Sequence, residues 1–258
     1  LGGINYYRYP FRYYSNLEVR DSSVEELYAL TQSLAIDANE LREMTNGEDE
    51  KGAFQLSLGM HELAEQAAEA MAKLSEDYPV LGGKYGAPKP VLLSSLMSHT
   101  EITGIFIPFT MEANVNVDIP DYSIPSTMLH ELAHLRGFMR EDEANFIAYL
   151  AGMKSENPEI NYSSTMLALI ISGNALYKEN ADLYFEIRDQ YSDKVLIDIR
   201  ENSRYWQQYE DTVISTVSNK INDTYLKVND QSDGVKSYGR MVDLLLAKYR
   251  QDNRIDEN

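Results

Sequence analysis

The stretch His130-Glu131-Leu132-Ala133-His134 decides which fold and which chemistry the sequence predicts. On an α-helix, residues four positions apart lie one turn apart on the same face, so the two imidazoles would project side by side. Two ring nitrogens placed in this way can bind one zinc ion, each at about 2.0–2.1 Å. Glu131 points about 100° away from His130, where its carboxylate can take a proton from a water held by the metal.

The flanking sequence favours a helix over these residues. Pro125 suits the first helical turn, where its missing N–H costs nothing, and Gly137 permits a sharp exit. The chain has four histidines, and two of them fall in this arrangement. The alternative is a helix with two histidines satisfied in the core and an exposed Glu131.

A third ligand is expected shortly after the motif, because a catalytic zinc site takes three protein ligands and leaves the fourth position for water. The chain continues after Gly137 with Glu141-Asp142-Glu143-Ala144-Asn145, which is predicted to open the next helix. Carboxylates also suit a helix N-terminus for electrostatic reasons, so the three acids cannot all be explained as ligands.

The pattern Glu141-x-x-Ala144-Asn145 resembles the Glu-x-x-Ala-Asp/Asn element of gluzincin metallopeptidases. The resemblance implies that Glu141 is the third zinc ligand, with Glu143 as the alternative, and that Asn145 orients His130 or His134. Six residues separate His134 from Glu141, which is fewer than gluzincins usually have. Metzincins place a third histidine just after the glycine turn, but Arg140 stands at the matching position and cannot bind a metal.

A longer part of the chain resembles a bacterial family of unknown function that has membrane-embedded N-termini and an HExxH domain outside the membrane. The resemblance implies a zincin-like fold, an anchor upstream of residue 1 and a location on the extracytoplasmic side of the cell membrane. It implies no substrate. The matching stretches are 5–8, 88–94, 103–110, 112–116, 130–138, 141–151 and 234–240.

Composition excludes several classes of function. The 258 residues carry 41 acidic and 23 basic side chains, a net charge of −18, so phosphate backbones would be repelled and no nucleic-acid partner is expected. The chain has no cysteine, which excludes disulfides, thiolate metal sites and cysteine nucleophiles. No window approaches the roughly 20 apolar residues that span a bilayer.

The pattern along the chain predicts a mainly helical α+β fold with a small sheet before the HExxH helix. Residues 1–20 form an aromatic segment that is either a strip packed on the domain or a collar beside a membrane, and residues 21–258 form one zincin-like domain. We expect a helix capped by Ser23 and Glu26 and a second helix over 54–77. The predicted strands are 91–96, 104–109 and 114–118.

Two further groups of residues are candidates for contact with a substrate. Zincins usually place an edge strand beside the site helix, and the candidate here is Gly104-Ile105-Phe106-Ile107, although a purely structural hairpin fits equally well. Tyr238, or alternatively Arg240, could stabilise the oxyanion formed when water attacks an amide.

These observations lead to one main functional hypothesis and two alternatives. The first is zinc-dependent hydrolysis of peptide bonds in a peptide or protein substrate, with the metal-bound water activated by Glu131. The second is a catalytically inactive zincin-fold domain of the cell envelope that binds metal as a sensor or interaction module. A third is a helical envelope module without metal.

Overall fold

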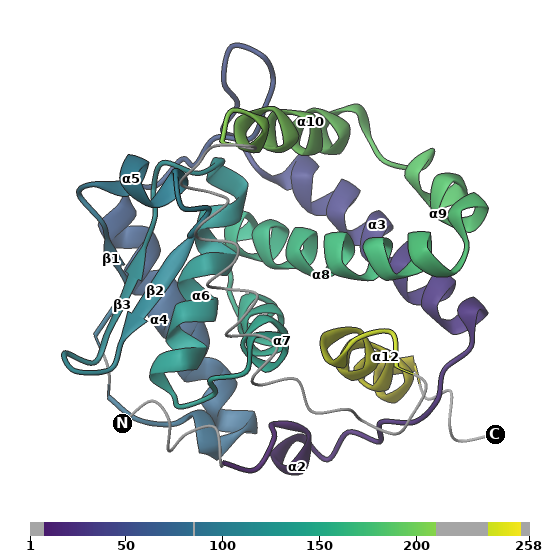
Figure 1. The fold of residues 1–258 in the computed structure, drawn as a ribbon, viewed down its shortest axis with the longest axis horizontal. Helices are drawn as coiled ribbons and strands as arrows, with labels where there is room; N and C mark the ends of the chain where they lie inside the picture. The colour runs from purple at the N-terminus through teal and green to yellow at the C-terminus, as the bar shows by residue number, and fades with distance from the viewer. Residues whose placement is uncertain (1–7, 85, 210–236, 254–258) are drawn as a thin grey trace.

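The computed structural model describes residues 8–84, 86–209 and 237–253 (Figure 1). Helices dominate the described chain, and a small sheet precedes the helix that carries residues 130–134, as the sequence predicts. The helices are α2 (Arg12–Ser15), α3 (Val24–Met44), α4 (Met60–Asp77), α5 (Ser94–Ser98), α6 (Ile124–Leu135), α7 (Glu141–Gly152), α8 (Pro158–Glu179), α9 (Ala181–Arg188), α10 (Asp193–Gln207) and α12 (Arg240–Asn253), with short 3-10 helices η1 (Pro79–Leu81) and η2 (Asp121–Ser123).

The sheet has three described strands in the order β1-β3-β2, namely β1 (Lys89–Pro90), β3 (Glu112–Val115) and β2 (Gly104–Ile107). β1 runs parallel to β3, and β2 runs antiparallel to it with Gly104 opposite Val115. The predicted strand at 104–109 therefore exists but ends at Ile107, and the strand predicted at 114–118 begins two residues earlier. Among the described strands, β2 lies at one edge of the sheet.

The strand predicted over 91–96 is wrong. β1 ends at Pro90, and the chain then turns into α5. The turn is fixed by the hydroxyl of Ser94, which donates to the carbonyl of Val91 at 2.7 Å and accepts the N–H of Val117 at 2.9 Å. The β-branched and leucine-rich composition of this stretch favours a strand, but the hydrogen bonds of the Ser94 side chain stabilise a turn there instead.

The two N-terminal helices agree with the sequence in different degrees. The capping box at the start of α3 is confirmed, because the Ser23 hydroxyl accepts the Glu26 N–H and the Glu26 carboxylate accepts the Ser23 N–H. The second helix begins at Met60 rather than at residue 54. Phe54 instead forms an antiparallel bridge, and its N–H donates to Asp198 at 2.7 Å, which no local pattern could indicate.

In Figure 1, α6 lies between the sheet and α7, and α3, α8 and α12 extend away on the far side of α7 from the sheet. α3 and α8 pack along each other, and α6 packs on β2 and β3 on one side and on α4, α7 and α8 on others. Nearly all of α6 is buried, which explains why its spacers Leu132 and Ala133 are uncharged. α12 closes the body by packing on α7, α8 and α3. Among the described helices, none combines the length and the apolar content that a membrane crossing requires.

The described part of the aromatic segment, residues 8–20, packs on the domain. Phe11 and Leu17 belong to the same buried core as the helices. Arg8 lies over the ring of Phe138 at 4.5 Å and donates to the carbonyl of Arg136 at 2.7 Å, so the segment clasps the turn between α6 and α7. The remaining residues of the predicted segment, 1–7, lie outside the described ranges.

A buried ion pair attaches α10 to the body. Arg42 of α3 donates to Asp198 of α10 at 2.7 Å, and neither side chain has exposed surface. The Asp198 carboxylate also accepts the Tyr162 hydroxyl at 2.6 Å and the Phe54 N–H. Four segments distant in sequence therefore meet at one carboxylate, which fixes α10 in place.

We expect Asp198→Asn to lower the free energy of unfolding by about 3–5 kcal/mol, because Arg42 would remain buried without a full counter-charge. Urea unfolding followed by circular dichroism measures the change. Glu201→Gln on the same helix is the control, since Glu201 makes surface pairs with Lys51 and Arg204 that are worth less than about 1 kcal/mol. Equal effects of the two substitutions would contradict the role given to Asp198.

Candidate metal centre

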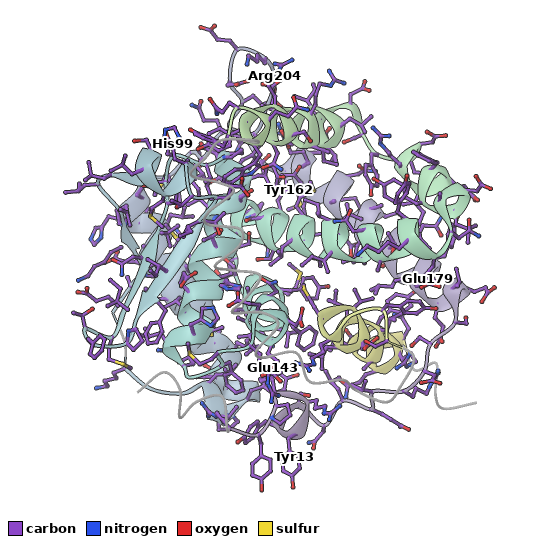
Figure 2. All side chains as sticks on the ribbon, viewed as in Figure 1. Tyr13, His99, Glu143, Tyr162, Glu179 and Arg204 are labelled. Carbon is purple, nitrogen blue, oxygen red and sulfur yellow. The ribbon has the colours of Figure 1, made fainter. Side chains whose placement is uncertain are left out.

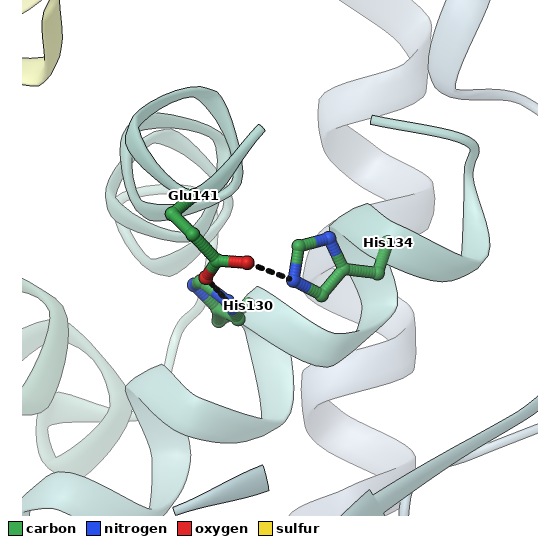
Figure 3. Close-up of side chains that lie close together, drawn as sticks. All are labelled: His130, His134 and Glu141. Atoms are coloured by element: carbon green, nitrogen blue, oxygen red, sulfur yellow. Dashed lines mark ion pairs between the residues drawn. The ribbon is translucent and has the colours of Figure 1, made fainter. Parts of the chain in front are cut away.

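Three side chains from α6 and α7 meet at one point (Figure 3). The Nε2 atom of His130 lies 3.1 Å from one carboxylate oxygen of Glu141, and Nε2 of His134 lies 3.6 Å from the other. The two imidazole rings have centroids 4.5 Å apart. Two nitrogens and a carboxylate thus converge from adjacent helices; the spacing of the HExxH motif predicts the two imidazoles, and the resemblance to gluzincins implies the carboxylate of Glu141.

Hydrogen bonds at the other ring nitrogens orient both imidazoles. Nδ1 of His130 lies 2.7 Å from Oδ1 of Asn145, and Nδ1 of His134 lies 2.7 Å from the backbone carbonyl of Phe138. Each partner is an oxygen acceptor, so Nδ1 carries the hydrogen in both rings and the lone pair of each neutral imidazole lies on Nε2. The Nε2 atom of each ring faces Glu141: in the neutral ring it carries a lone pair that a metal ion could accept, and in the protonated ring it donates to the Glu141 carboxylate. Asn145 takes the orienting role predicted for it, whereas the Phe138 carbonyl was not predicted.

The turn between the two helices explains how a short connection can bring Glu141 to both histidines. Gly137 adopts a positive φ of 92° just after α6, a conformation that side chains disfavour. Its N–H donates to the His134 carbonyl and the N–H of Phe138 donates to the Ala133 carbonyl, which is the Schellman pattern. The chain reverses within five residues, 136–140, and α7 begins directly at Glu141.

Glu131 lies beside this group in a buried position. It is 4% exposed, and its Oε2 atom has no hydrogen-bond partner among the described residues. The residue opposite it is Gly104 at the start of β2: a Cβ atom at that position would lie 2.5 Å from Oε1 of Glu131. The backbone of the edge strand therefore approaches the carboxylate as closely as a glycine allows. The sequence pattern predicts the strand, but it contains no signal for the contact between Gly104 and Glu131.

The electrostatics of the site follow from burial and from close charges. Burial acts to raise the pKa of the Glu141 carboxyl, but hydrogen bonds with His130 and His134 outweigh it and hold that pKa well below its usual range. Burial raises the pKa of Glu131, and the two imidazoles offset this only in part. Burial acts to lower the pKa of His130, but the hydrogen bond with Glu141 and the nearby carboxylate charges raise it.

The donor set fits a divalent transition metal. Two neutral imidazoles and one carboxylate are among the ligand sets that zinc uses in catalytic sites. Their ligand atoms all lie within 4.8 Å of one another, and within the described ranges they form the one such group. The unpartnered oxygen of Glu131 is a second indication that a polar ligand binds at this site, because buried carboxylate oxygens are normally hydrogen-bonded.

The structure does not bring the remaining predicted residues to this point. Glu143 is buried on another face of α7, where it accepts the Phe11 N–H at 2.9 Å, and it is not in the group that could hold a metal. Burial raises its pKa, which the Phe11 N–H and nearby arginines oppose. The hydroxyl of Tyr238 donates to the Ser22 carbonyl at 3.0 Å, and Arg240 opens α12 near Glu143. Neither of these contacts is with His130, His134 or Glu141.

A cavity of about 380 Å³ adjoins the group. His130, Glu141 and Asn145 form part of its wall, and Asn202 and Trp206 of α10 form another part. The rest of the described lining consists of hydroxyl-bearing and apolar side chains: Thr103, Tyr122, Ser123, Ser126, Thr127, Ser163, Leu167, Ile170 and Ile171. Apart from His130 and Glu141, the described lining contains no acidic or basic side chain.

A family described as "Protein of unknown function (DUF3810)" matches residues 1–246. The chain belongs to the DUF3810 family. The DUF3810 match confirms that the chain resembles a family of unknown function, but it gives no link to a zinc metallopeptidase family. Comparisons with curated proteins and with solved structures gave no match.

We expect Asn145→Ala to weaken zinc binding by about 10- to 100-fold, because Nδ1 of His130 would lose its acceptor and the ring its orientation. Competition with a chromogenic chelator measures the affinity. His61→Ala is the control, since His61 is exposed and pairs only with Glu65 in the described structure. Unchanged affinity in Asn145→Ala, with the fold intact by circular dichroism, would show that the hydrogen bond does not support a metal site.

Proposed function

We propose that this protein is a zinc-dependent hydrolase of peptide bonds. The observation that carries the proposal is the buried carboxylate of Glu131, which has an unpartnered oxygen and lies beside three convergent ligands. A purely structural zinc site has four protein ligands and no use for an additional carboxylate. The described residues supply three ligands, which favours hydrolysis over non-catalytic metal binding.

The residues that would hold the ion are His130 and His134 through Nε2 and Glu141 through its carboxylate. A zinc ion bound there would supply Lewis acidity, which polarises a carbonyl oxygen and makes water a stronger acid at neutral pH. The hydrogen bonds from Nδ1 to Asn145 and to Phe138 prepare both rings for this role, because they fix the tautomer and the ring orientation in advance.

Glu131 is suited to the work of a general base. Burial raises the pKa of Glu131, and a carboxylate with a raised pKa accepts a proton more readily. In the proposed reaction its free oxygen accepts a proton from the attacking water and passes it to the leaving amine. The motif places this carboxylate on α6, one residue from the ligand His130, so its position is fixed by the same helix.

The edge strand β2 is suited to align an extended peptide. Gly104 begins the strand directly against Glu131, and the adjacent Thr103 lines the cavity beside His130. A peptide that added to β2 as a further strand would be held by backbone hydrogen bonds close to the carboxylate. The uncharged lining of the cavity favours an apolar or hydroxyl-bearing side chain next to the bond to be cleaved.

We expect Glu131→Gln to keep its zinc and to reduce hydrolysis of a peptide library by about 100-fold or more, because the amide cannot accept the proton. Mass spectrometry of the products measures turnover. Glu62→Gln is a matched control, since Glu62 follows His61 in the same His-Glu-Leu-Ala sequence but is exposed on α4. Equal turnover in Glu131→Gln and wild type would remove Glu131 from the mechanism.

We expect Gly104→Ala to reduce turnover by roughly 10- to 100-fold with zinc retained, because the added methyl group displaces Glu131 or the strand and small misplacements of catalytic groups are costly. Gly86→Ala serves as the control, because a Cβ atom there meets no heavy atom within 4 Å among the described residues. Full activity in Gly104→Ala would show that the close approach of β2 has no part in catalysis.

A further inference from the structure

A second cavity, of about 240 Å³, is rich in arginine. Three segments distant in sequence build it: the N-terminal segment around α2, the start of α7, and the start of α12. Its described lining contains four arginines, two carboxylates and four uncharged residues: Arg12, Arg20, Arg140, Arg240, Glu143, Asp243, Pro10, Val19, Ser237 and Leu244. The cavity lies on the side of α7 where Glu143 is buried, so it is separate from the proposed metal site.

The charge of this cavity is opposite to that of the protein. The chain has a net charge of −18 and 23 basic residues in all, yet four guanidinium groups face two carboxylates here. A local excess of positive charge in a strongly acidic protein raises the concentration of anions at that place.

Both carboxylates already have backbone or hydroxyl partners. Glu143 accepts the Phe11 N–H at 2.9 Å. Asp243 accepts the Ser237 hydroxyl and the Tyr238 N–H. These hydrogen bonds hold both carboxylates to the chain itself.

Three of the arginines lie close enough to Glu143 to offset its charge, but a single carboxylate cannot neutralise three guanidinium groups. Arg12, Arg140 and Arg240 all surround that single carboxylate. Arg140 forms an ion pair with Glu143, in which Nη1 lies 3.7 Å from Oε1, a distance longer than a hydrogen bond. Within the described ranges, the Arg12 side chain makes no hydrogen bond and no ion pair. Arg20 pairs with Glu26 at 3.1 Å at the rim.

We propose that this cavity binds a phosphate group. Guanidinium groups present paired N–H donors that match phosphate oxygens, and a phosphate monoester carries between about one and two negative charges at neutral pH. With Arg20 paired to Glu26, the lining still sets the three arginines Arg12, Arg140 and Arg240 against two carboxylates, which is an excess of positive charge. α7 and α12 also begin at this cavity, and the positive ends of their dipoles add to the attraction.

The size of the cavity limits what can enter. Pockets for drug-sized ligands measure about 300–1,000 Å³, so this cavity suits a phosphate group rather than a whole nucleotide. The phosphate group can be a free anion or the head of a lipid. Tyr9 and Tyr13 are exposed beside Arg12 and stack with centroids 4.7 Å apart, and such aromatic residues favour a lipid–water interface.

The test measures binding of inorganic phosphate to the full chain by isothermal titration calorimetry at constant ionic strength. The variants are Arg12→Gln and the double variant Arg12→Gln, Arg140→Gln, each checked for fold by circular dichroism. Arg204→Gln is the matched control: Arg204 pairs with Glu201 on α10, and it lies at the opposite end of the molecule from Glu143 in Figure 2. If the double variant does not fold, the single variant Arg12→Gln alone still tests the proposal, because the Arg12 side chain is exposed.

We expect saturable phosphate binding by wild type and by Arg204→Gln, and binding about tenfold or more weaker in Arg12→Gln, as for the loss of one charge-assisted hydrogen bond. Absence of saturable binding by wild type, or equal binding by wild type and Arg12→Gln, would overturn the proposal. Sedimentation with phosphatidylcholine vesicles, with and without phosphatidic acid, then identifies the source. Arginine-dependent binding only to vesicles with phosphatidic acid indicates a lipid headgroup, and no vesicle binding indicates a soluble phosphate. No step of the test involves zinc or hydrolysis, so its outcome is independent of the proposed function.

Discussion

The hydrogen bonds at Nδ1 of His130 and His134 determine what the rest of the candidate site can do. A neutral imidazole that donates from Nδ1 presents its lone pair at Nε2, and in both rings Nε2 faces Glu141. The acceptors come from the turn after α6 and from α7 itself. The chain reverses at Gly137, and Arg8 packs against this turn. The orientations of the two histidines are therefore fixed by the turn and by α7 as well as by the helix that carries them.

Two glutamates in the first turn of α7 lie in different environments. Glu141 faces the imidazoles of α6, whereas Glu143, two residues later and about 200° around the helix, is buried toward the N-terminal segment and the arginines. Glu141 and Glu143 thus have unrelated roles, although they are the same residue type in the same helical turn. Burial and partner, rather than residue type, separate a candidate ligand from a carboxylate that fastens one segment to another.

The parts of the candidate site that local geometry controls could be predicted from the sequence. Helical spacing predicted that His130 and His134 lie side by side, whereas Glu141 and Asn145 were singled out by the resemblance to the gluzincin element, with Glu143 as the alternative. The acceptor of His134 is a backbone carbonyl, which carries no residue-specific signal. The contact of Gly104 with Glu131 and the late start of α4, caused by Phe54 and Asp198, arise from tertiary packing and were beyond local patterns.

The two histidines also differ in how far along the chain their support lies. His134 is oriented by Phe138, four residues away, so the final turn of α6 suffices to aim that ring. His130 depends on Asn145, fifteen residues away, and acquires its partner only when α7 docks. A partly folded chain would then offer an ion one aimed nitrogen instead of three ligands. Metal affinity and the docking of α7 would be thermodynamically linked, so that part of the free energy of ion binding stabilises the contact between these helices.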